Sequence, residues 1–329
     1  MKPVSWGVLS VSNHYVSVIN TNVRKSPLNV VQAIASRSAD KARAAAARLG
    51  IPRAYGSYAE LLADKDIEAV YIPLPNQHHA EWARKAADAG KHVLCEKPFA
   101  MSAEEAQQTF DHARRKGVLV MESLMYRFHP QWIRAGEIAR NGELGEIHAV
   151  NAFFSYMIPD PANVRNILGI GGGGMRDVGS YAVSAARFLV GAEPARVLSL
   201  MHRDPVLKTD TLSTGLLDFG KARSVFTVGT QTQAWQRVEA IGSGGMMTID
   251  IPFNAYPDTP AVITVTGWNG TRTVQLPAAD QFVEVFDAFS RAVRAGGPVP
   301  QPPEDTVNNQ KALDALFRSE KSGTWEPVR

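Results

Sequence analysis

The sequence lacks the features that mark secreted, membrane-spanning or nucleic-acid-binding proteins. One cysteine among 329 residues excludes internal disulfides and cysteine-based zinc sites, and it suits a reducing compartment. No apolar run approaches the roughly 20 residues that span a bilayer, and no secretory signal is visible at the N-terminus. No run of Lys and Arg is interleaved with aromatic residues. We therefore expect a cytoplasmic protein that binds neither nucleic acid nor membrane, and we expect no metal site.

The bulk composition is that of a globular protein. Hydrophobic residues make up 45% of the chain and charged residues 20%, with a formal net charge of +3. A chain of 329 residues is too long for one ordinary core, so we expect two domains.

Strands and helices alternate without interruption through the first part of the chain. Apolar strands are predicted at 4–11, 29–35, 67–72, 91–95 and 118–121, and helices at 39–49, 58–63, 80–89 and 103–116. This alternation predicts an α/β domain over residues 1–123, built on a doubly wound parallel sheet.

The pattern changes over residues 124–329. Predicted helices at 132–140 and 175–189 flank a long strand at 146–156, and two helices at 281–295 and 304–319 close the chain. Between them the strand-like segments follow one another without helices, at 196–202, 211–217, 224–229, 237–242, 246–251, 262–265 and 271–276. The second domain should therefore be α+β, with an antiparallel or mixed sheet.

Glycine is absent where a dinucleotide-binding turn, Gly-x-Gly-x-x-Gly, would follow the first strand. The turn reads Ser-Val-Ser-Asn-His-Tyr over residues 10–15. Ser10 and Ser12 are small and can donate hydrogen bonds to a phosphate, whereas Tyr15 is hard to reconcile with close helix packing. This turn alone leaves the presence of a nucleotide site open.

An acid is also absent at the end of the second strand, where an NAD-binding domain usually places one for the ribose hydroxyls. The chain has Ser36 and Arg37 there, with Lys41 one turn later. A hydroxyl and a guanidinium suit a 2′-phosphate, which favours NADP over NAD. The alternative is an arginine that is simply solvated at the start of a helix.

Two later stretches carry reactive side chains. Glu96 and Lys97 end a buried strand before Pro98, either at a ligand crevice or as a surface salt bridge. A glycine run precedes Asp177 and Tyr181, which share one helix face at i and i+4. Those two are either an acid/base pair, or an acid favoured by the helix dipole beside a packed tyrosine. After the third strand, Leu74 lies between two prolines that form a rigid wall, and Asn76 is a candidate helix cap.

These motifs in this order resemble the glucose–fructose oxidoreductase / inositol dehydrogenase / rhizopine catabolism (Gfo/Idh/MocA) family. The chain looks most like the branch of dihydrodiol dehydrogenases, xylose dehydrogenases and 1,5-anhydrofructose reductases. The matching signatures span roughly half of the chain: Leu74-Pro-Asn with His79, Gly90-Lys-His-Val through Glu96-Lys-Pro, Tyr126-Arg-Phe-His-Pro, and Gly172-Gly-Gly-Met-Arg-Asp-Val-Gly-Ser-Tyr181.

The resemblance implies a Rossmann domain that binds NADP over residues 1–123. It also implies an α+β domain over 124–329, with a large open-faced, mostly antiparallel sheet for substrate binding and oligomerisation. Lys97 would be the catalytic lysine, with Asp177 and Tyr181 as its partners and Pro98 often in the cis form. The residues expected at the cofactor are Ser10, Ser12, Ser36, Arg37, Lys41, Leu74, Asn76, His79, Glu96, Lys97 and Arg127.

The function expected from this resemblance is an NADP-dependent oxidoreductase. It would move a hydride between the nicotinamide and a secondary alcohol or ketone of a sugar, sugar derivative or polyol. Either Tyr181 or Lys97 would be the acid/base, with Asp177 orienting Lys97. The alternative is a non-catalytic NAD(P)-binding regulator of the same fold, which the missing glycines favour. A homodimer or homotetramer through the C-terminal sheet is expected.

Overall fold

The computed structural model describes residues 1–329 and contains two compact units. The first comprises Met1–Met125 together with Phe282–Val307, and the second comprises Tyr126–Gln281 together with Asn308–Arg329. The predicted boundary after residue 123 lies close to the first change of unit. The return of 282–307 to the first unit was not predicted, and its physical cause is the packing of one late helix described below.

The first unit is built on a six-stranded sheet in which every neighbouring pair is parallel. The order is β3-β2-β1-β4-β5-β6, that of a dinucleotide-binding Rossmann sheet. The predicted α/β class is therefore confirmed. The strands are β1 (Val4–Leu9), β2 (Asn29–Ala35), β3 (Arg53–Tyr55), β4 (Ala69–Ile72), β5 (His92–Glu96) and β6 (Val120–Ser123).

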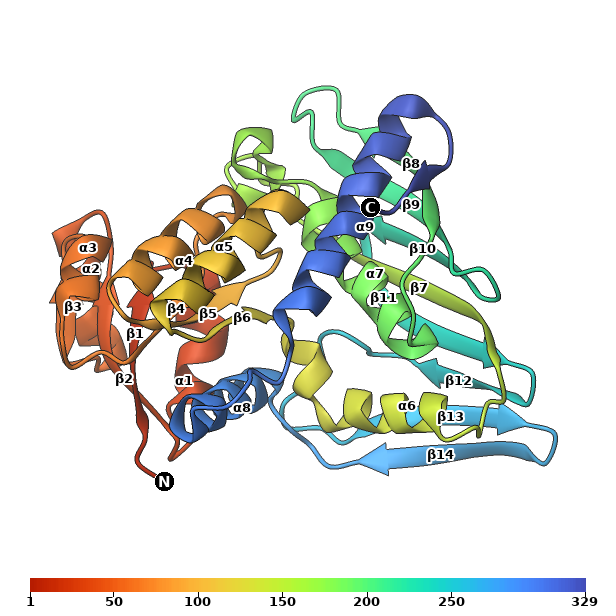
Figure 1. Cartoon of the computed structure of the whole chain (residues 1–329), viewed down its shortest axis with the longest axis horizontal. Coiled ribbons are helices and arrows are strands. Elements are labelled where there is room, and N and C mark those ends of the chain that lie inside the picture. Colours follow the sequence, from red (N-terminus) through yellow and green to blue (C-terminus); the bar gives the residue numbers. More distant parts are fainter. The chain divides into compact units, whose positions relative to one another are not determined.

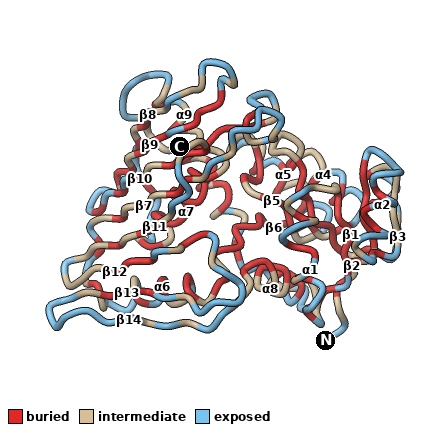
Figure 2. Tube along the Cα trace, turned by 180° about the vertical axis from the view of Figure 1, so that it is seen from behind, coloured by how far each residue is buried: buried red, intermediate tan, exposed pale blue.

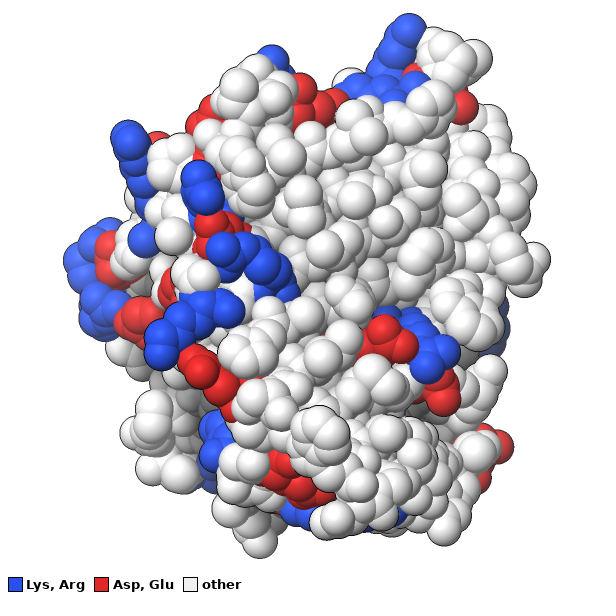
Figure 3. Space-filling model, turned by 90° about the vertical axis from the view of Figure 1, so that its right-hand side faces the viewer, with Lys and Arg blue, Asp and Glu red and all other residues white.

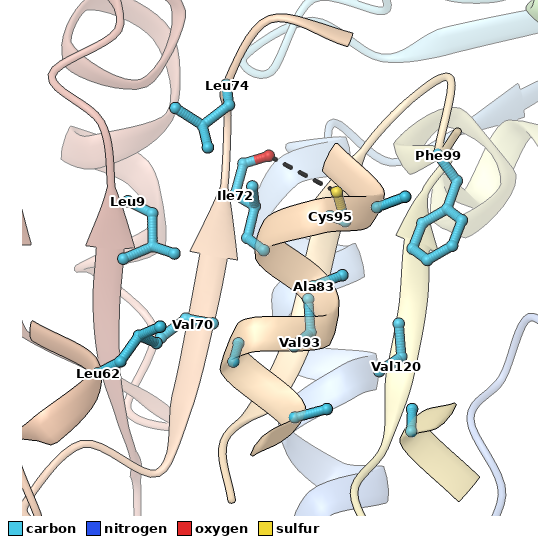
Figure 4. Close-up of a cluster of buried hydrophobic side chains, with 14 of the residues drawn as sticks. Leu9, Leu62, Val70, Ile72, Leu74, Ala83, Val93, Cys95, Phe99 and Val120 are labelled. Carbon is cyan, nitrogen blue, oxygen red and sulfur yellow. Dashed lines mark hydrogen bonds between the residues drawn. The ribbon is translucent and has the colours of Figure 1, made fainter. Parts of the chain in front are cut away.

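Helices α4 (His79–Asp88) and α5 (Ala103–Lys116) pack against each other over one face of this sheet (Figure 1). Together with α3 (Tyr58–Ala63) they enclose a buried apolar cluster with strand residues such as Leu9, Val70 and Val93 (Figure 4). The cluster contains the single cysteine, Cys95, which is fully buried. Burial raises the pKa of its thiol, so this cysteine is a packing residue.

The other face of the sheet is covered in an unusual way. The first crossover is short, with a π-helical turn η1 (Tyr15–Ile19) followed by only four residues of α1 (Asn20–Val23). Helix α8 (Gln281–Ala295), from late in the chain, packs its apolar side here, with Phe286 against Trp6 at 4.7 Å and against Tyr71 at 5.1 Å between ring centroids. Residues 282–307 therefore belong to the first unit because they complete its core.

Helix boundaries were predicted well where the sequence has a recognisable capping residue at both ends of the helix. Helix α2 (Ala39–Leu49) begins after Ser38, whose side chain accepts the Lys41 N–H, and ends at Gly50 in the left-handed region with φ 61°. Helix α5 begins after Ser102 and ends at Gly117, with φ 70°. Serine satisfies a free N–H of the first turn, and glycine takes the positive φ without steric cost.

The second unit contains a nine-stranded sheet in the order β14-β13-β12-β11-β7-β10-β9-β8-β15. All of its pairs are antiparallel except β7 with β10, so the expected mostly antiparallel sheet is confirmed. The strands are β7 (Ile147–Met157), β8 (Arg196–Arg203), β9 (Asp210–Asp218), β10 (Arg223–Gly229), β11 (Gln231–Gly242), β12 (Gly245–Ile249), β13 (Ala261–Gly267), β14 (Gly270–Leu276) and β15 (Glu326–Pro327).

One face of this sheet is buried by helices. Helix α7 (Ser180–Val190) packs against β7, and α6 (Pro130–Arg140) packs against α7 and β13. Helix α9 (Pro303–Ser322) contributes Ser319, which donates to the carbonyl oxygen of Thr324 and accepts the Ser199 N–H of β8. Burial follows this layering, since the strands beneath the helices are buried and the β13–β14 hairpin is largely exposed (Figure 2). No helix in the chain has the length and apolar character that crossing a membrane requires.

Candidate active site

The carboxyl ends of the parallel strands lie at one edge of the first unit. Ser10 follows β1, Ser36 follows β2, Leu74 lies just after β4, and Lys97 follows β5. Because all of these strands are parallel, the structure brings the predicted cofactor residues of the first unit to the same edge, where Rossmann sheets bind nucleotides.

Serines stand at the first two glycine positions of the nucleotide-binding turn, and one of them has a backbone conformation that favours glycine. Ser10 has φ 145°, a conformation that glycine takes easily and other residues rarely adopt. Ser12 accepts the Tyr15 N–H at 3.2 Å through its hydroxyl and so caps the turn. The Tyr15 ring is fully buried, and its hydroxyl donates to Asn20 at 3.1 Å. Tyr15 is tolerated because a π-helical turn, rather than a closely packed α-helix, begins there.

The end of β2 presents two cations. Arg37 and Lys41 are exposed, while Ser36 is buried and its hydroxyl accepts the Ser38 N–H at 3.3 Å. Tyr58, the first residue of α3, joins this group, because its hydroxyl interacts with the Ser10 side chain and with the charge of Arg37. Burial raises the Tyr58 pKa. Sequence reasoning missed Tyr58, since nothing local marks a tyrosine on α3 as a neighbour of the first turn.

Glu96 is buried and does not form the exposed salt bridge that was its alternative interpretation. It is 7% exposed, and the Tyr71 hydroxyl donates to its Oε1 at 2.6 Å. Burial and the Glu96 charge together raise the Tyr71 pKa. The peptide bond between Lys97 and Pro98 is cis, as the resemblance implied.

Two buried side chains hold the backbone just after Lys97. The Nδ1 of His79 lies 2.8 Å from the carbonyl oxygen of Pro98, and its Nε2 lies 2.7 Å from that of Leu74. His79 therefore ties together the segments that follow β4 and β5, and both of its ring nitrogens are occupied by backbone. Burial lowers its pKa. On the other side, the Phe99 N–H donates to Oε1 of Glu122 at 2.9 Å.

Glu122, on β6, was not predicted from the sequence. It is 3% exposed, and burial raises the pKa of its carboxyl to about 7, with smaller contributions from Asp305 and Glu96. Its only signal in the sequence is an acid inside an apolar strand. Asn76 also differs from expectation, because helix α4 has no side-chain cap and Asn76 lies in the preceding 3₁₀ turn η2 (Asn76–His78).

In the second unit a polar cluster surrounds Asp177. The Tyr156 hydroxyl donates to Oδ2 of Asp177, and the Arg165 Nε donates to the same oxygen at 2.9 Å. Asp177 is only 13% exposed, and Arg165 forms an ion pair with it. The Asp177 charge raises the Arg165 pKa, while burial and Asp177 raise the Tyr156 pKa. Tyr156 and Arg165 were not predicted, since both are distant from Asp177 in the sequence.

Tyr181, the second residue of α7, lies beside this cluster. It lies close enough to Arg165 and Tyr156 for its ionisation to contribute to raising the pKa of both. The Tyr181 ring is 5% exposed and packs among aromatic rings, including Phe154 at 5.5 Å and Phe253 at 5.4 Å. Asp177 and Tyr181 were predicted to share the face of one helix; in the structure Asp177 lies in the π-helical turn η6 (Met175–Gly179), which directly precedes α7.

Two other predicted features have contacts of their own in the second unit. The Arg127 guanidinium stacks on the Phe188 ring at 4.2 Å. The glycines before η6 lie against other parts of the chain. A Cβ at Gly173 would overlap the carboxylate of Asp210, and one at Gly172 would lie 2.6 Å from the Arg165 carbonyl oxygen. Asp210 in turn accepts the Met175 N–H at 2.6 Å. No group of three or more His, Cys, Asp or Glu side chains could hold a metal ion.

Comparison with known proteins places both halves of the chain in one family. Residues 7–124 match the model of an oxidoreductase family with an NAD-binding Rossmann fold, and residues 132–248 match the GFO/IDH/MocA C-terminal domain. The chain is 41% identical to an uncharacterised oxidoreductase of Rhizobium meliloti, covering 100% of both. It is 38% identical to a D-xylose 1-dehydrogenase (NADP(+)) of Haloferax volcanii, covering 97% of this chain and 98% of that one.

Among solved structures, the chain is similar to a 3-ketoreductase from Actinomadura kijaniata in complex with NADP and TDP-benzene. The TM-score is 0.90 at 30% identity, covering 96% of this chain and 98% of that one. Other structures of the same ketoreductase carry a tyrosine replaced by phenylalanine, or a lysine replaced by alanine or glutamate. Those two positions are separated by the same number of residues as Lys97 and Tyr181.

Proposed function

The chain belongs to the Gfo/Idh/MocA family of oxidoreductases, and on that basis we propose that it transfers a hydride between NADP and a sugar or polyol. The reacting group is a secondary alcohol or ketone. The family and the Rossmann fold expected from the sequence are confirmed. Relatives that include a D-xylose dehydrogenase and a dTDP-sugar 3-reductase act on sugars, and the 3-ketoreductase binds NADP, in agreement with the expected class of reaction.

The residues present at the edge of the first unit fit NADP. Ser10 has a positive φ that glycine takes easily, which suits the tight turn after the first strand of a nucleotide-binding domain. Exposed Arg37 and Lys41 stand where an NAD-binding domain would carry an acid, and they suit the 2′-phosphate. When bound, the nicotinamide supplies or accepts the hydride. The observation that carries this proposal is the absence of an acid at the end of β2, together with the NADP-dependent relatives.

Lys97 and Tyr181 are the groups that we assign to the proton of the substrate hydroxyl. One holds or moves that proton and the other polarises the carbonyl oxygen. The matching separation of the lysine and tyrosine replaced in the ketoreductase supports this assignment. His79 and Glu122 position Lys97 by fixing the backbone that follows it. The Tyr71 hydroxyl holds the side chain of Glu96, the residue before Lys97.

The expected role of Asp177, to orient Lys97, stays a proposal, and we add a second role for this carboxylate. Its Oδ2 is occupied by Arg165 and Tyr156 within its own unit. We assign to it the task of accepting a hydrogen bond from a substrate hydroxyl, because a carboxylate held ionised by a guanidinium is a strong acceptor.

The test is to measure absorbance change with NADP and with NAD over a panel that contains D-xylose, other aldoses and polyols. We expect turnover with NADP and weaker turnover with NAD. Lys97→Met and Tyr181→Phe should each lower kcat by roughly 100-fold or more, because a positioned acid/base group contributes about that factor. The exposed residues Lys221 and Tyr256 supply the matched controls Lys221→Met and Tyr256→Phe. A blank panel with tight NADP binding in calorimetry would favour the regulator instead.

We also propose that the open face of the nine-stranded sheet joins copies of the chain into a homodimer or homotetramer in the cytoplasm. The strand registers place Leu200, Leu212, Val225 and Trp235 on the face opposite α7, all at least 40% exposed. The side of the second unit seen in Figure 3 has a broad area without charged side chains. An exposed sheet face that carries several large apolar side chains is typical of an interface. Sedimentation of the wild type and of Val225→Glu measures it: only the wild type should associate.

A further inference from the structure

Arg165 has hydrogen-bond donors that the protein itself does not use. Its Nε donates to Asp177, while neither of its terminal nitrogens, Nη1 and Nη2, has a partner in the structure. The side chain is 33% exposed, so these donors can be reached from outside. A guanidinium presents its terminal N–H groups as a rigid planar fork, and such a fork binds two neighbouring oxygens at once.

The backbone of Arg165 is fixed before any ligand arrives. Its N–H donates to the Asn163 side chain at 3.1 Å, and its carbonyl oxygen accepts the Gly173 N–H at 2.9 Å. A side chain larger than hydrogen at Gly172 would press on the same carbonyl. The glycine run therefore brings the segment of Arg165 against the turn of Asp177. A donor group held in place in this way loses little conformational entropy on binding.

The charge around the fork favours an uncharged ligand. Asp177 already neutralises Arg165, and Asp177 lies beside the place that a ligand of the fork would occupy. A carboxylate or phosphate would gain from the guanidinium but would be repelled by Asp177. A hydroxyl suits both groups, because it accepts from Arg165 and donates to Asp177.

We propose that Arg165 is a specificity-determining residue whose terminal nitrogens donate to two adjacent hydroxyl oxygens of an uncharged sugar. One is the hydroxyl or carbonyl that reacts, and the other is on the neighbouring carbon. This inference rests on the proposed function, and it narrows the substrate class to sugars that keep a vicinal diol at the reacting position. Sugars that lack the second hydroxyl, or that carry an acid there, are excluded as good substrates.

The test compares sugars with and without that hydroxyl. The wild type, Arg165→Met and Arg165→Lys are assayed with NADP on D-xylose, D-glucose and the 2-deoxy analogue of each, with oxidation at carbon 1. The wild type should prefer the full sugar by roughly 10- to 100-fold in kcat/KM, the size of a hydrogen bond to a charged group. Relative to the wild type, the kcat/KM of Arg165→Met should fall by roughly that factor with the full sugars and should change little with the 2-deoxy sugars. Arg165→Lys should recover part of it, because an ammonium can still donate to one oxygen.

The result that overturns the inference is a loss in Arg165→Met that is equal for the full and the deoxy sugars, since a purely structural role affects both alike. Arg134→Met, at an exposed arginine that pairs with Glu137 on α6, is the matched control.

The proposed function fails separately, if the wild type oxidises none of these sugars with NADP. In that case calorimetry of the NADP complex with D-glucose and with 2-deoxy-D-glucose tests Arg165 directly. We expect D-glucose to bind at least 10-fold more tightly, and Arg165→Met to remove the difference. Equal affinities in the wild type, or no binding of either sugar, would contradict the role of Arg165.

Discussion

At the scale of single residues, Ser10 has a backbone conformation that suits glycine better. Its φ of 145° costs a non-glycine residue on the order of 1–3 kcal/mol. Ser10→Gly should therefore raise the free energy of unfolding by about 1 kcal/mol, measured by urea denaturation. Ser12→Gly is the contrasting variant, because it removes the hydroxyl that accepts the Tyr15 N–H and should lower stability by about 1 kcal/mol. Equal effects of both replacements would show that the turn is not strained at Ser10.

Glu122 should make stability depend on pH. Its folded-state pKa of about 7 is above the ordinary value of 4.5, so folding favours the protonated carboxyl. The stabilisation that comes from the protonated carboxyl is fully present below about pH 4.5. As the pH rises through 7, the free energy of unfolding falls by about 3 kcal/mol. Glu122→Gln, which cannot ionise, should therefore gain melting temperature relative to the wild type between pH 5 and 8. Scanning calorimetry at several pH values measures this, and a constant difference would contradict it.

The sequence predicts some of the site residues because their chemistry is local. Lys97 follows a buried strand directly, and Asp177 and Tyr181 share one helix face, so each is marked by its neighbours in the chain. Tyr156 and Arg165 bind Asp177 only because a strand and a loop fold back onto it. Long-range contacts of this kind leave no periodic pattern in one sequence, and so they could not be predicted.

At the scale of elements, the turn before α7 depends on the absence of one side chain. Gly173 has φ 122°, and a Cβ there would overlap the Asp210 carboxylate, which accepts the Met175 N–H at the start of η6. Gly173→Ala should lower the free energy of unfolding by roughly 2–4 kcal/mol, from strain and the displaced cap. Gly169→Ala is the matched control, because nothing lies within 4 Å of its added Cβ. Equal urea midpoints for the two variants would contradict this.

Most elements were predictable, and the missed ones are short or lie at sheet edges. The helices α2, α3 and α5 and the strand β2 match their predicted bounds. The strands β3 and β15 have three and two residues, too few for a period of two to show. Strand β11 begins at Gln231 rather than at 237. Its polar first half has no apolar alternation, and it is a strand because it pairs with the end of β7.

At the scale of the whole molecule, the first unit needs a segment from far along the chain. Helix α8 covers Trp6 and Tyr71, and Arg294 at its end donates to both carboxylate oxygens of Glu68, at 2.7 and 2.6 Å. A fragment of residues 1–125 should therefore show no cooperative thermal transition. The same fragment joined by a flexible linker to residues 282–307 should melt cooperatively and bind NADP in calorimetry. Cooperative melting of 1–125 alone would contradict the role of α8.

This arrangement explains why one domain boundary could be predicted and the other could not. The change from alternating strands and helices to consecutive strands is visible near residue 124. Helix α8 is amphipathic, and its apolar face would suit either unit equally well as a pattern. Only the three-dimensional fit of Phe286 between two aromatic rings decides its place.

The division of the chain also has a consequence for its synthesis on the ribosome. At about 5–20 residues per second, the ribosome needs on the order of 10 to 40 seconds to pass from residue 125 to residue 307. During that interval the aromatic face that α8 will cover has no partner. We expect chaperones to bind a nascent chain with such an exposed apolar surface. The complete nucleotide-binding unit can form only when nearly the whole protein has been made.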